Sequence, residues 1–583
     1  MKFRELSLYL QQLEKTASRI EITKILAEFF RKADAAEIDK ATYLLLGKLA
    51  PNYKGIVFNI KDRMMIRILA KAYGKDQRVV LSKYKQKGDL GGVAQDLASG
   101  RGGNISVTEV YEKLLKVAEE HGEDSQERKV LGLAQILSLL DPLSSRYVTR
   151  IPLGRLRLGF SDKTILDALS WMEKGDKSAK NALERAYEVL PDVGLLAKEV
   201  KLKGIERATK DASPMLGVPI MPMLAQRLKS PSEMIEKMGE VAVEPKFDGL
   251  RISIHFKSKG FAKDVTEGLK SNNDKVKAFT RNMNETSWMF PELKLAESFI
   301  KADEVILDSE AVGVDETRKI LANFQQTMTR RRKHEIEKIS AQIPIKFYVF
   351  DILYKDGKSL IDLKYLERRK MLEKTVKDGR LFEVVAYQIT DKPEEIKFQN
   401  SQKRKMGFEG IIIKRLSSEY VPGRTGWRWV KMKEAEESVG KMADTVDCVV
   451  MGYTRGKGKR VSFGLGQFLV GVRDNEEIKT VTKVGTGLTD EQFRELKKRL
   501  SGLEVKEKPK NYEVNKLLEP DFWVVPEVVV EIAADEVTKS PTHSSGYALR
   551  FPRLVRFRDD KDPTGATTVK ELKKLLDMQK FDI

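Results

Sequence analysis

Cysteine is almost absent from this chain: Cys448 is the only one among 583 residues. A single cysteine excludes intrachain disulfides and any zinc site built from several cysteines. No apolar run reaches the length of about 18 residues that a membrane-spanning helix needs. The first residues, 1–6, lack the charged-then-apolar order of a signal peptide. We therefore expect an intracellular, cytoplasmic protein that does not contact a membrane.

Basic residues outnumber acidic ones. The chain has 106 Lys plus Arg against 86 Asp plus Glu, for a formal charge of +20 and an isoelectric point near 9.4. Such a balance favours a phosphate-rich partner, and nucleic acid is the most common one. A solvated basic surface would give the same numbers, so charge alone does not decide. The hydrophobic fraction of 41% is sufficient for packed cores, and the length predicts about three or four domains.

Residues 1–212 are predicted to form an all-α domain. Leu6, Leu10 and Leu13 recur at helical spacing, and similar patterns continue through the region. The pair Phe29-Phe30 distantly resembles a sliding-clamp-binding peptide, but Thr23 stands where the glutamine of such a peptide would be. We therefore interpret these phenylalanines as the core of an amphipathic helix.

The pattern changes after a proline-rich connector that begins near residue 213. Residues 213–435 alternate short strands with helices, which predicts an α/β domain with a mixed, largely antiparallel sheet. Residues 436–583 are rich in strands with glycine-bearing turns and are predicted to form an all-β OB-fold, followed by a helix over 568–578. The strands of this last domain are expected at 447–452, 466–472, 478–484 and 522–532.

Two connectors of the helical region could contact phosphates. Residues 99–103 combine glycines with Arg101, and residues 152–159 alternate arginine with leucine. In the second connector the alternation predicts that Arg155 and Arg157 face solvent or a phosphate while the leucines enter a core. An ordinary solvent loop is the alternative for both.

The most informative stretch is residues 241–251, Val-Ala-Val-Glu-Pro-Lys-Phe-Asp-Gly-Leu-Arg. It predicts a strand that ends at Lys246, a tight turn at Asp248-Gly249 and a second strand that begins at once. A lysine at this turn can attack phosphorus if burial or nearby cations keep it neutral. Taken alone, Lys246 could equally be a surface residue beside a hairpin.

Further strands place charged and aromatic residues where a nucleotide could use them. Alternation puts Arg251, Ser253 and His255 on one strand face, and Glu310 at the end of another apolar strand. Tyr348 and Phe350 share a face that could stack on a base. Period two likewise predicts one shared face, rich in lysine and tryptophan, that suits a triphosphate; its members are Trp427, Trp429, Lys431 and Lys433.

Taken together, these motifs resemble those of ATP-dependent DNA ligases, in particular the archaeal and eukaryotic replicative type with an N-terminal helical DNA-binding domain. The resemblance covers essentially the whole chain. It rests on residues 244–251, on the blocks around Arg281, Glu310 and Phe350, and on residues 409–414, 429–433 and 549–561.

The resemblance implies a role for each matching residue. Lys246 becomes the catalytic lysine that is adenylated. The implied ATP contacts are Glu244, Arg251, Arg281, Glu310, Phe350, Arg424, Lys431 and Lys433. The implied Mg²⁺ ligands are Glu310 and Glu409, the implied DNA contacts are Arg155 and Arg157, and an adenylation motif on the OB-fold comprises Arg556, Asp560 and Lys561.

Two features depart from the family pattern. Residues 257–275 form an apparent polar insertion. Thr425 stands where the family often has a second arginine, which leaves Arg424 as the nucleotide contact and Arg428 as its substitute.

The expected function is sealing of nicks in duplex DNA, with ATP and Mg²⁺ as cofactors, through a lysine-AMP intermediate and an adenylated 5′-phosphate. This activity serves DNA replication, repair and recombination, and through them cell division. We expect a monomer, with a sliding clamp as a further candidate partner. RNA ligases and mRNA-capping guanylyltransferases share the lysine motif but need no helical arm of this size. A non-catalytic nucleic-acid scaffold is disfavoured by the joint presence of Lys246, Glu310, Glu409, Lys431 and Lys433.

The three expected domains suggest a clamp that contacts the DNA backbone without reading sequence. We therefore predict that affinity for a nicked duplex falls by about 1000-fold or more between roughly 50 and 200 mM salt, because phosphate contacts release counterions. A gel-shift titration measures this, with nicks of unrelated sequence as controls that should bind equally. A flat salt response would argue against the clamp.

Overall fold

The structure is a computed structural model that describes residues 1–99, 104–156, 158–228, 230–261, 275–315, 320–321, 344–423, 426–433, 444–456, 463–485 and 488–578. At residues 315, 320, 321 and 433 it describes the backbone alone. The chain divides into two compact units, Met1–Met432 and Lys433–Ile583. The first unit contains both the helical and the α/β regions, so the boundaries 1–212, 213–435 and 436–583 stay predictions.

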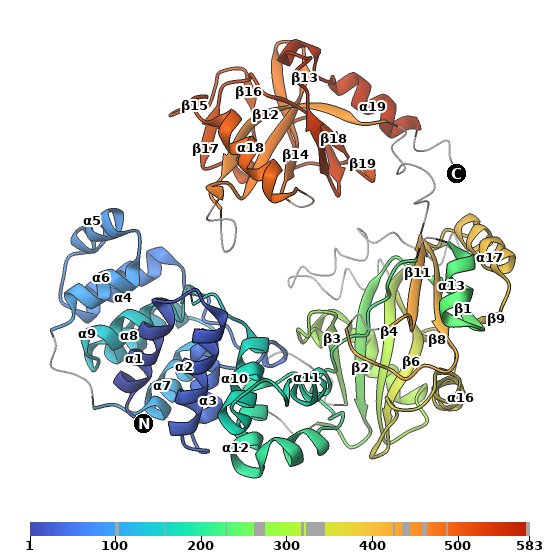
Figure 1. Ribbon diagram of the computed structural model, residues 1–583, viewed down its shortest axis with the longest axis horizontal. Coiled ribbons are helices and arrows are strands. Elements are labelled where there is room, and N and C mark those ends of the chain that lie inside the picture. The colour runs from blue at the N-terminus through green and yellow to red at the C-terminus, as the bar shows by residue number, and fades with distance from the viewer. Residues whose placement is uncertain are drawn as a thin grey trace. The chain divides into compact units, whose positions relative to one another are not determined.

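The N-terminal region is helical, as the sequence predicts (Figure 1). Its helices are α1 (Phe3–Glu14), α2 (Arg19–Lys32), α3 (Ile38–Leu45), α4 (Asp62–Ala72), α5 (Gln77–Lys87), α6 (Leu90–Leu97), α7 (Val107–Glu119), α8 (Ser125–Ser138), α9 (Pro142–Arg150), α10 (Asp162–Lys174), α11 (Lys180–Val189) and α12 (Val193–Lys210).

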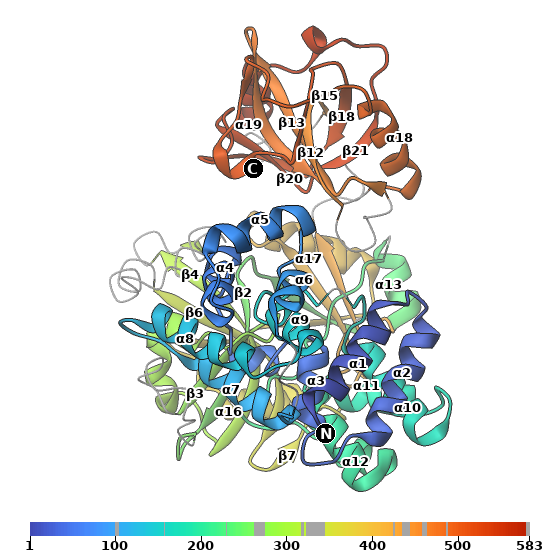
Figure 2. The same ribbon diagram turned by 90° about the vertical axis from the view of Figure 1, so that its left-hand side faces the viewer.

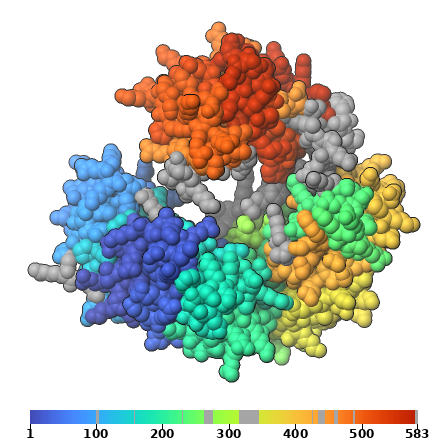
Figure 3. All heavy atoms as spheres, in the orientation of Figure 1, coloured from blue at the N-terminus to red at the C-terminus, as the bar shows by residue number. Residues whose placement is uncertain are grey.

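These helices share one hydrophobic core. Figure 3 shows the outer face of this region, coloured blue to teal. Leu6, Leu10 and Leu13 of α1 are buried in it, as their spacing predicts. Phe29 and Phe30 are fully buried and meet edge to face, with ring centroids 5.4 Å apart. The interpretation of this pair as core is therefore confirmed.

The α/β region follows within the same unit. Its elements are α13 (Pro231–Met238), β1 (Val241–Lys246), β2 (Leu250–Lys257), β3 (Val276–Thr280), β4 (Glu304–Asp315), β5 (Ile320–Leu321), β6 (Ile345–Lys355), β7 (Lys358–Ser359), α16 (Tyr365–Thr375), β8 (Phe382–Val384), β9 (Gln388–Thr390), α17 (Pro393–Lys405), β10 (Gly410–Arg415) and β11 (Trp429–Lys433).

The strands form two sheets that are joined by the turn after β1. One sheet has the order β11-β10-β1-β9, and the other has β3-β2-β4-β6-β7 with β5 and β8 attached. The pairs β1–β10, β2–β4 and β4–β6 are antiparallel, and β8 joins β6 in parallel. The mixed, largely antiparallel arrangement is therefore confirmed.

The four-stranded sheet buries one face under helices and keeps charged groups on the other. Val241 and Val243 of β1 pack with Ile411 and Ile413 of β10 against residues of α13 and α17. Because strand side chains alternate, Glu244 and Lys246 lie on the opposite face of β1. This second face packs toward β6: Trp429 of β11 shares an apolar cluster with residues of β4 and β6.

The prediction that Trp427 lies on the strand face of Trp429 is wrong. Trp427 was expected beside Trp429, but β11 begins only at Trp429, and Trp427 lies in the turn before it. Gly426 has a φ of 51°, so the chain is not extended there and period two does not apply. Trp427 packs instead with the cluster under α13, where the Lys237 ammonium lies 4.6 Å from its ring centroid.

The C-terminal unit is strand-rich, as predicted (Figure 2). Its elements are β12 (Val446–Thr454), β13 (Gln467–Asp474), β14 (Glu477–Val484), α18 (Asp490–Leu500), β15 (Glu504–Val505), β16 (Tyr512–Glu513), β17 (Phe522–Val524), β18 (Val529–Ala533), β19 (Glu536–Lys539), β20 (Tyr547–Arg550), β21 (Arg553–Phe557) and α19 (Val569–Met578). β12 to β14 form an antiparallel meander, and β18 pairs with both β12 and β21.

The predicted strand 522–532 is two strands, β17 and β18. Between them lies Pro526, and the Glu527 backbone N–H donates to the Val525 carbonyl at 2.9 Å, which turns the chain. Proline cannot donate to a strand ladder, so the run breaks there. The predicted C-terminal helix is confirmed as α19, which buries Leu572.

The structure also describes the single cysteine and the helices of the chain. Cys448 is buried in β12, and burial raises the pKa of its thiol. No helix in the described ranges is long and apolar enough to cross a membrane.

His255 anchors the proline-rich connector to the α/β region. The ring is fully buried on β2 and accepts a hydrogen bond at Nδ1 from the Gly217 backbone N–H at 3.1 Å. Its Nε2 lies 3.2 Å from the Ser253 hydroxyl, and the ring meets Phe279 edge to face at 4.8 Å. Burial, aided by the charge of Lys277, lowers the pKa of His255 to about 3.

A neutral buried histidine makes stability depend on pH. Between pH 6.5 and 3 the unfolded chain binds a proton that the folded chain excludes, so stability falls as pH falls. From pH 7.5 to 5.5 we expect His255 to contribute a loss of about 1.4 kcal/mol. Thermal unfolding at the two pH values should therefore show a smaller pH dependence in His255→Gln than in the parent. The control is His121→Gln at an exposed histidine; an unchanged pH dependence in His255→Gln would contradict the assignment.

Candidate active site

The candidate site begins where β1 crosses into β2. Lys246 ends β1, and residues 247–249 connect it directly to the second sheet. Gly249 permits this connection: a Cβ there would lie 2.5 Å from the Ala311 carbonyl oxygen and 3.0 Å from Cγ of Glu310. The glycine of the Lys-Phe-Asp-Gly motif therefore lets β2 approach β4 closely beside the lysine.

The Lys246 amine is mostly withdrawn from solvent, with 20% of its side chain exposed. It forms an ion pair with Glu409, which stands just before β10, and the Glu409 backbone N–H donates to the Lys246 carbonyl at 2.9 Å. Burial lowers the pKa of Lys246, and the positive charge of Arg281 lowers it further. The negative charges of Glu310 and Asp248 raise it. A lowered pKa increases the fraction of neutral amine, which is the nucleophilic form.

Glu310 lies on β4 of the neighbouring sheet. In the strand register it stands opposite Arg251 of β2 and Tyr348 of β6. Burial raises its pKa to about 7, against the opposing charges of Lys246 and Arg251. The structure thus brings together three residues that the sequence singled out, Lys246, Glu310 and Arg251.

Arg251 is held by a network that the sequence did not predict. Its Nε and one Nη bind the Asp308 carboxylate at 3.0 and 2.6 Å, and its other Nη donates to the Met223 carbonyl at 2.6 Å. The Tyr420 hydroxyl donates to Asp308 at 3.0 Å. Asp308 could have been found because it shares the strand face of Glu310, whereas Tyr420 carries no such signal.

Aromatic rings line the same side of the site. Phe350 of β6 and Trp429 of β11 meet edge to face with centroids 5.9 Å apart. The Arg251 guanidinium lies 5.5 Å from the Phe350 ring and 5.4 Å from the Trp429 ring. Phe350 is half-buried.

Glu244 is buried at 2% exposure, on the same face of β1 as Lys246. One carboxylate oxygen pairs with the Lys414 ammonium at 2.7 Å, and the other accepts from the Tyr365 hydroxyl. Neither partner was predicted as a site residue. Lys414 is the last residue of the 409–414 motif and lies one residue before the end of β10, whereas nothing in the sequence connects the first residue of α16 with this carboxylate.

The structure describes only some of the other predicted ATP contacts. Lys431 is half-buried on β11, which neighbours β10 in the sheet, and Arg281 is exposed after β3. Arg424 and the side chain of Lys433 lie outside the described residues, as does most of the insertion at 257–275.

The helical connector is partly described. Leu156 and Leu158 are buried, as their alternation predicts. Arg155 is 46% exposed and pairs with Asp62 at 3.0 Å, and Arg157 lies outside the described residues.

In the C-terminal unit the predicted basic motif is held by carboxylates. Arg556 pairs with Glu531 at 2.6 Å, and Lys561 pairs with Asp447 at 2.6 Å. Arg558 bridges Asp447 and Asp560 at 2.9 and 2.7 Å. Asp447 and Glu531 face each other across β12 and β18, so the cations offset a repulsive cross-strand pair.

A metal ion could use two carboxylates here. No group of three or more His, Cys, Asp or Glu suited to a metal occurs in the parts of the chain that the structure describes. Mg²⁺ commonly takes only one or two carboxylates and completes its shell with water and phosphate. Glu409 forms an ion pair with Lys246, and the charge of Glu310 also acts on this amine. Two carboxylates near one amine fit such an ion.

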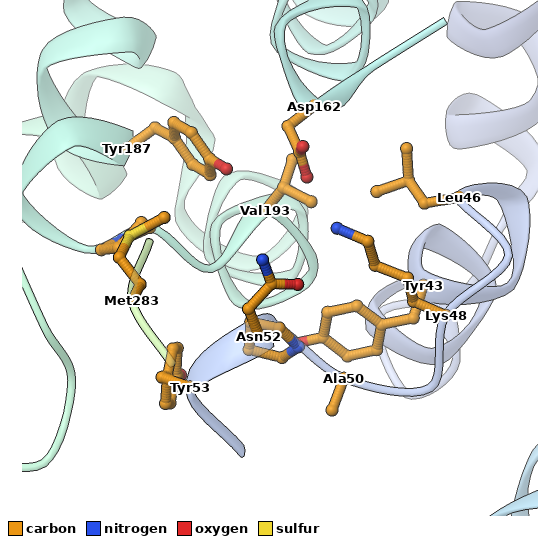
Figure 4. A pocket seen from close by; sticks show the side chains of 12 residues that line it. Tyr43, Leu46, Lys48, Ala50, Asn52, Tyr53, Asp162, Tyr187, Val193 and Met283 are labelled. Atoms are coloured by element: carbon orange, nitrogen blue, oxygen red, sulfur yellow. The ribbon is translucent and has the colours of Figure 1, made fainter. Parts of the chain in front are cut away.

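Two cavities of the first unit are small. One of about 80 Å³ lies among Tyr43, Asn52 and Tyr187 of the helical region and Met283 of the α/β region (Figure 4). None of the predicted nucleotide contacts lines it. The other, of about 20 Å³, adjoins Arg251 and has room for about one water.

Comparisons with known proteins identify the family that this chain resembles. Three family models match: DNA ligase N terminus over residues 2–170, ATP dependent DNA ligase domain over 222–433, and ATP dependent DNA ligase C terminal region over 462–561. The "Probable DNA ligase" of Dictyoglomus thermophilum is 38% identical over 593 residues, covering 100% of this chain and 98% of that protein.

Further relatives cover nearly the whole chain. "DNA ligase 1" of Methanosarcina acetivorans is 36% identical over 99% of both chains. The solved structure of Pmar-Lig_Pre is 18% identical and covers 95% of this chain and 99% of its own, with a TM-score of 0.54. This last likeness concerns the fold alone.

The Arg251–Asp308 pair yields a stability prediction. Asp308→Asn leaves a buried guanidinium without its counter-charge, which typically costs about 3 kcal/mol and should lower the thermal midpoint by about 3 °C or more. The matched control is Asp362→Asn, because Asp362 pairs with Arg185 on an exposed surface and should change the midpoint little. Equal shifts in differential scanning fluorimetry would contradict the structural role of Asp308.

Proposed function

Because the chain belongs to the ATP-dependent DNA ligase family, we propose that Lys246 is the residue of this enzyme that carries AMP. The observation that carries the proposal is the state of its amine: it is withdrawn from water, its pKa is lowered by burial, and it forms an ion pair with Glu409 while the charge of Glu310 acts on it. The family match favours joining of DNA over RNA ligation, mRNA capping or a non-catalytic scaffold.

In the first step the neutral Lys246 Nζ attacks the α-phosphorus of ATP. A P–N bond forms and the P–O bond to the leaving pyrophosphate breaks. The ammonium releases one proton to solvent before the attack, and the nitrogen releases a second one as the phosphoramidate forms. The Glu409 pair must part for this attack, because a lysine bound to a carboxylate is held as ammonium. AMP then passes to the 5′-phosphate at a nick, and the 3′-hydroxyl displaces it to seal the strand.

The surrounding residues position the nucleotide. Phe350 offers a ring on which adenine stacks, with Glu244 beside it for the base. Arg251, Arg281, Arg424, Lys431 and Lys433 provide positive charge for ribose and phosphates. The Asp308–Tyr420 network supports this role because it fixes the Arg251 guanidinium before any ligand arrives.

Glu310 and Glu409 are the residues that would hold Mg²⁺. When bound, the ion neutralises charge on the phosphate oxygens. Because burial raises the pKa of Glu310 to about 7, only about half of this carboxyl is ionised near pH 7, and metal binding is favoured at higher pH.

The DNA and partner contacts complete the proposal. Arg155 and Arg157 bind the duplex backbone, and Arg556, Asp560 and Lys561 serve self-adenylation. The enzyme acts as a cytoplasmic monomer on nicked DNA in replication, repair and recombination, and so in cell division. The buried Phe29-Phe30 pair is not available to a sliding clamp, so recruitment by a clamp requires another segment.

The test is self-adenylation with α-labelled ATP and Mg²⁺ in the absence of DNA. Lys246→Ala and Lys246→Arg should both lose the covalent label completely, because neither presents a neutral primary amine. Lys275→Ala is the control: this lysine pairs with Glu297 at the surface, and its loss should leave labelling unchanged. Label retained by both Lys246 variants would overturn the assignment.

A further inference from the structure

Tyr365 is a fully buried phenol with a carboxylate partner. It is the first residue of α16, its ring packs with Ala242 of β1 and with Leu416, and it meets Tyr387 edge to face at 6.0 Å. Its hydroxyl donates to Oε1 of Glu244. Burial and the charge of Glu244 raise the pKa of Tyr365 well above its ordinary range, so the phenol remains a donor.

The second oxygen of Glu244 is held just as firmly. Lys414 is 1% exposed, and its ammonium lies 4.8 Å from the Phe350 ring, 5.3 Å from Tyr365 and 4.4 Å from Trp429. It pairs with Oε2 of Glu244 at 2.7 Å and donates to the Phe350 carbonyl at 3.3 Å. One ammonium thus connects the Glu244 carboxylate with the residue whose ring is the proposed base platform.

We propose that Tyr365 is a positioning residue that orients the Glu244 carboxylate toward the 6-amino group of adenine and so contributes to selection of ATP over other nucleotides. The inference rests on the proposed function, in which Lys246 carries AMP and Phe350 stacks the base. Glu244 and Lys246 lie two residues apart on one face of β1, so the carboxylate and the phosphate-bearing amine face the same side.

The chemistry of the base explains the selectivity. An ionised carboxylate only accepts hydrogen bonds, and each oxygen has lone pairs left after one partner is bound. Adenine presents a donor at position 6, whereas guanine presents an acceptor that this carboxylate repels. A carboxylate fixed by a hydroxyl on one oxygen and an ammonium on the other loses little freedom when the amine arrives.

Without the Tyr365 hydroxyl, one oxygen loses its anchor in a buried place and the carboxylate can turn away from the base. Tyr365→Phe removes only that hydroxyl and keeps the ring that packs with Ala242 and Leu416. The penalty should therefore depend on whether the nucleotide has a 6-amino group.

The experiment compares two nucleotides in self-adenylation by the full-length enzyme: ATP, and purine riboside triphosphate, which lacks the 6-amino group. For Tyr365→Phe we expect the KM for ATP to rise about tenfold with kcat little changed, because a hydrogen bond involving a charged group is weakened. The KM for the analogue should stay within about twofold of the parent value. Tyr387→Phe, which keeps the Tyr365 hydroxyl, should affect neither nucleotide.

An equal loss with both nucleotides, or no loss with either, overturns the positioning role. Glu244→Gln provides a second route if Tyr365→Phe folds poorly: it should show the same ATP-specific penalty, and combining the two substitutions should add little further loss. Failure of the proposed function has a different signature, because label would then be found at a residue other than Lys246 in the parent enzyme.

Discussion

The structure depends on one electrostatic arrangement: an amine that is taken out of water and surrounded by carboxylates on two sheets. Lys246 ends β1 directly before the turn into β2; it forms an ion pair with Glu409, and the charge of Glu310 also acts on it. Desolvation favours the neutral form of the amine, whereas the carboxylates favour its charged form. The protonation equilibrium of Lys246 therefore shifts when another group competes for those carboxylates or brings negative charge to the amine.

Other buried cations around the site are also paired with carboxylates. Arg251 is matched by Asp308, Lys414 by Glu244, and the fully buried Arg368 by Asp351. Charges buried in this way need excellent geometry, since a cation that loses its partner is strongly destabilising. The pairs are therefore rigid, and rigidity is what positioning of a nucleotide requires.

The C-terminal unit uses a related device at its surface. Arg556, Arg558 and Lys561 are offset by Asp447, Glu531 and Asp560, so the basic motif is oriented while its charge is neutralised locally. A polyanion that engages these cations has to replace the carboxylates. In both units, then, side chains that suit phosphates are held in advance by acidic partners.

The sequence by itself determined the classes of structure in order along the chain and the buried faces of individual elements, and it singled out Lys246 as the proposed nucleophile. These follow from local rules: helical spacing buries Leu6 and Leu10, strand alternation puts Glu244 and Lys246 on one face, and the turn glycine permits close approach at residue 249. Local rules failed where a turn interrupts the pattern, as at Trp427 and at Pro526.

Only the tertiary structure decided which distant residues meet. Tyr365 lies 121 positions from Glu244, and Tyr420 lies 112 from Asp308, so no periodicity connects them. The same holds for the pKa values of Lys246 and Glu310, because desolvation depends on everything packed around a group rather than on its neighbours in the chain.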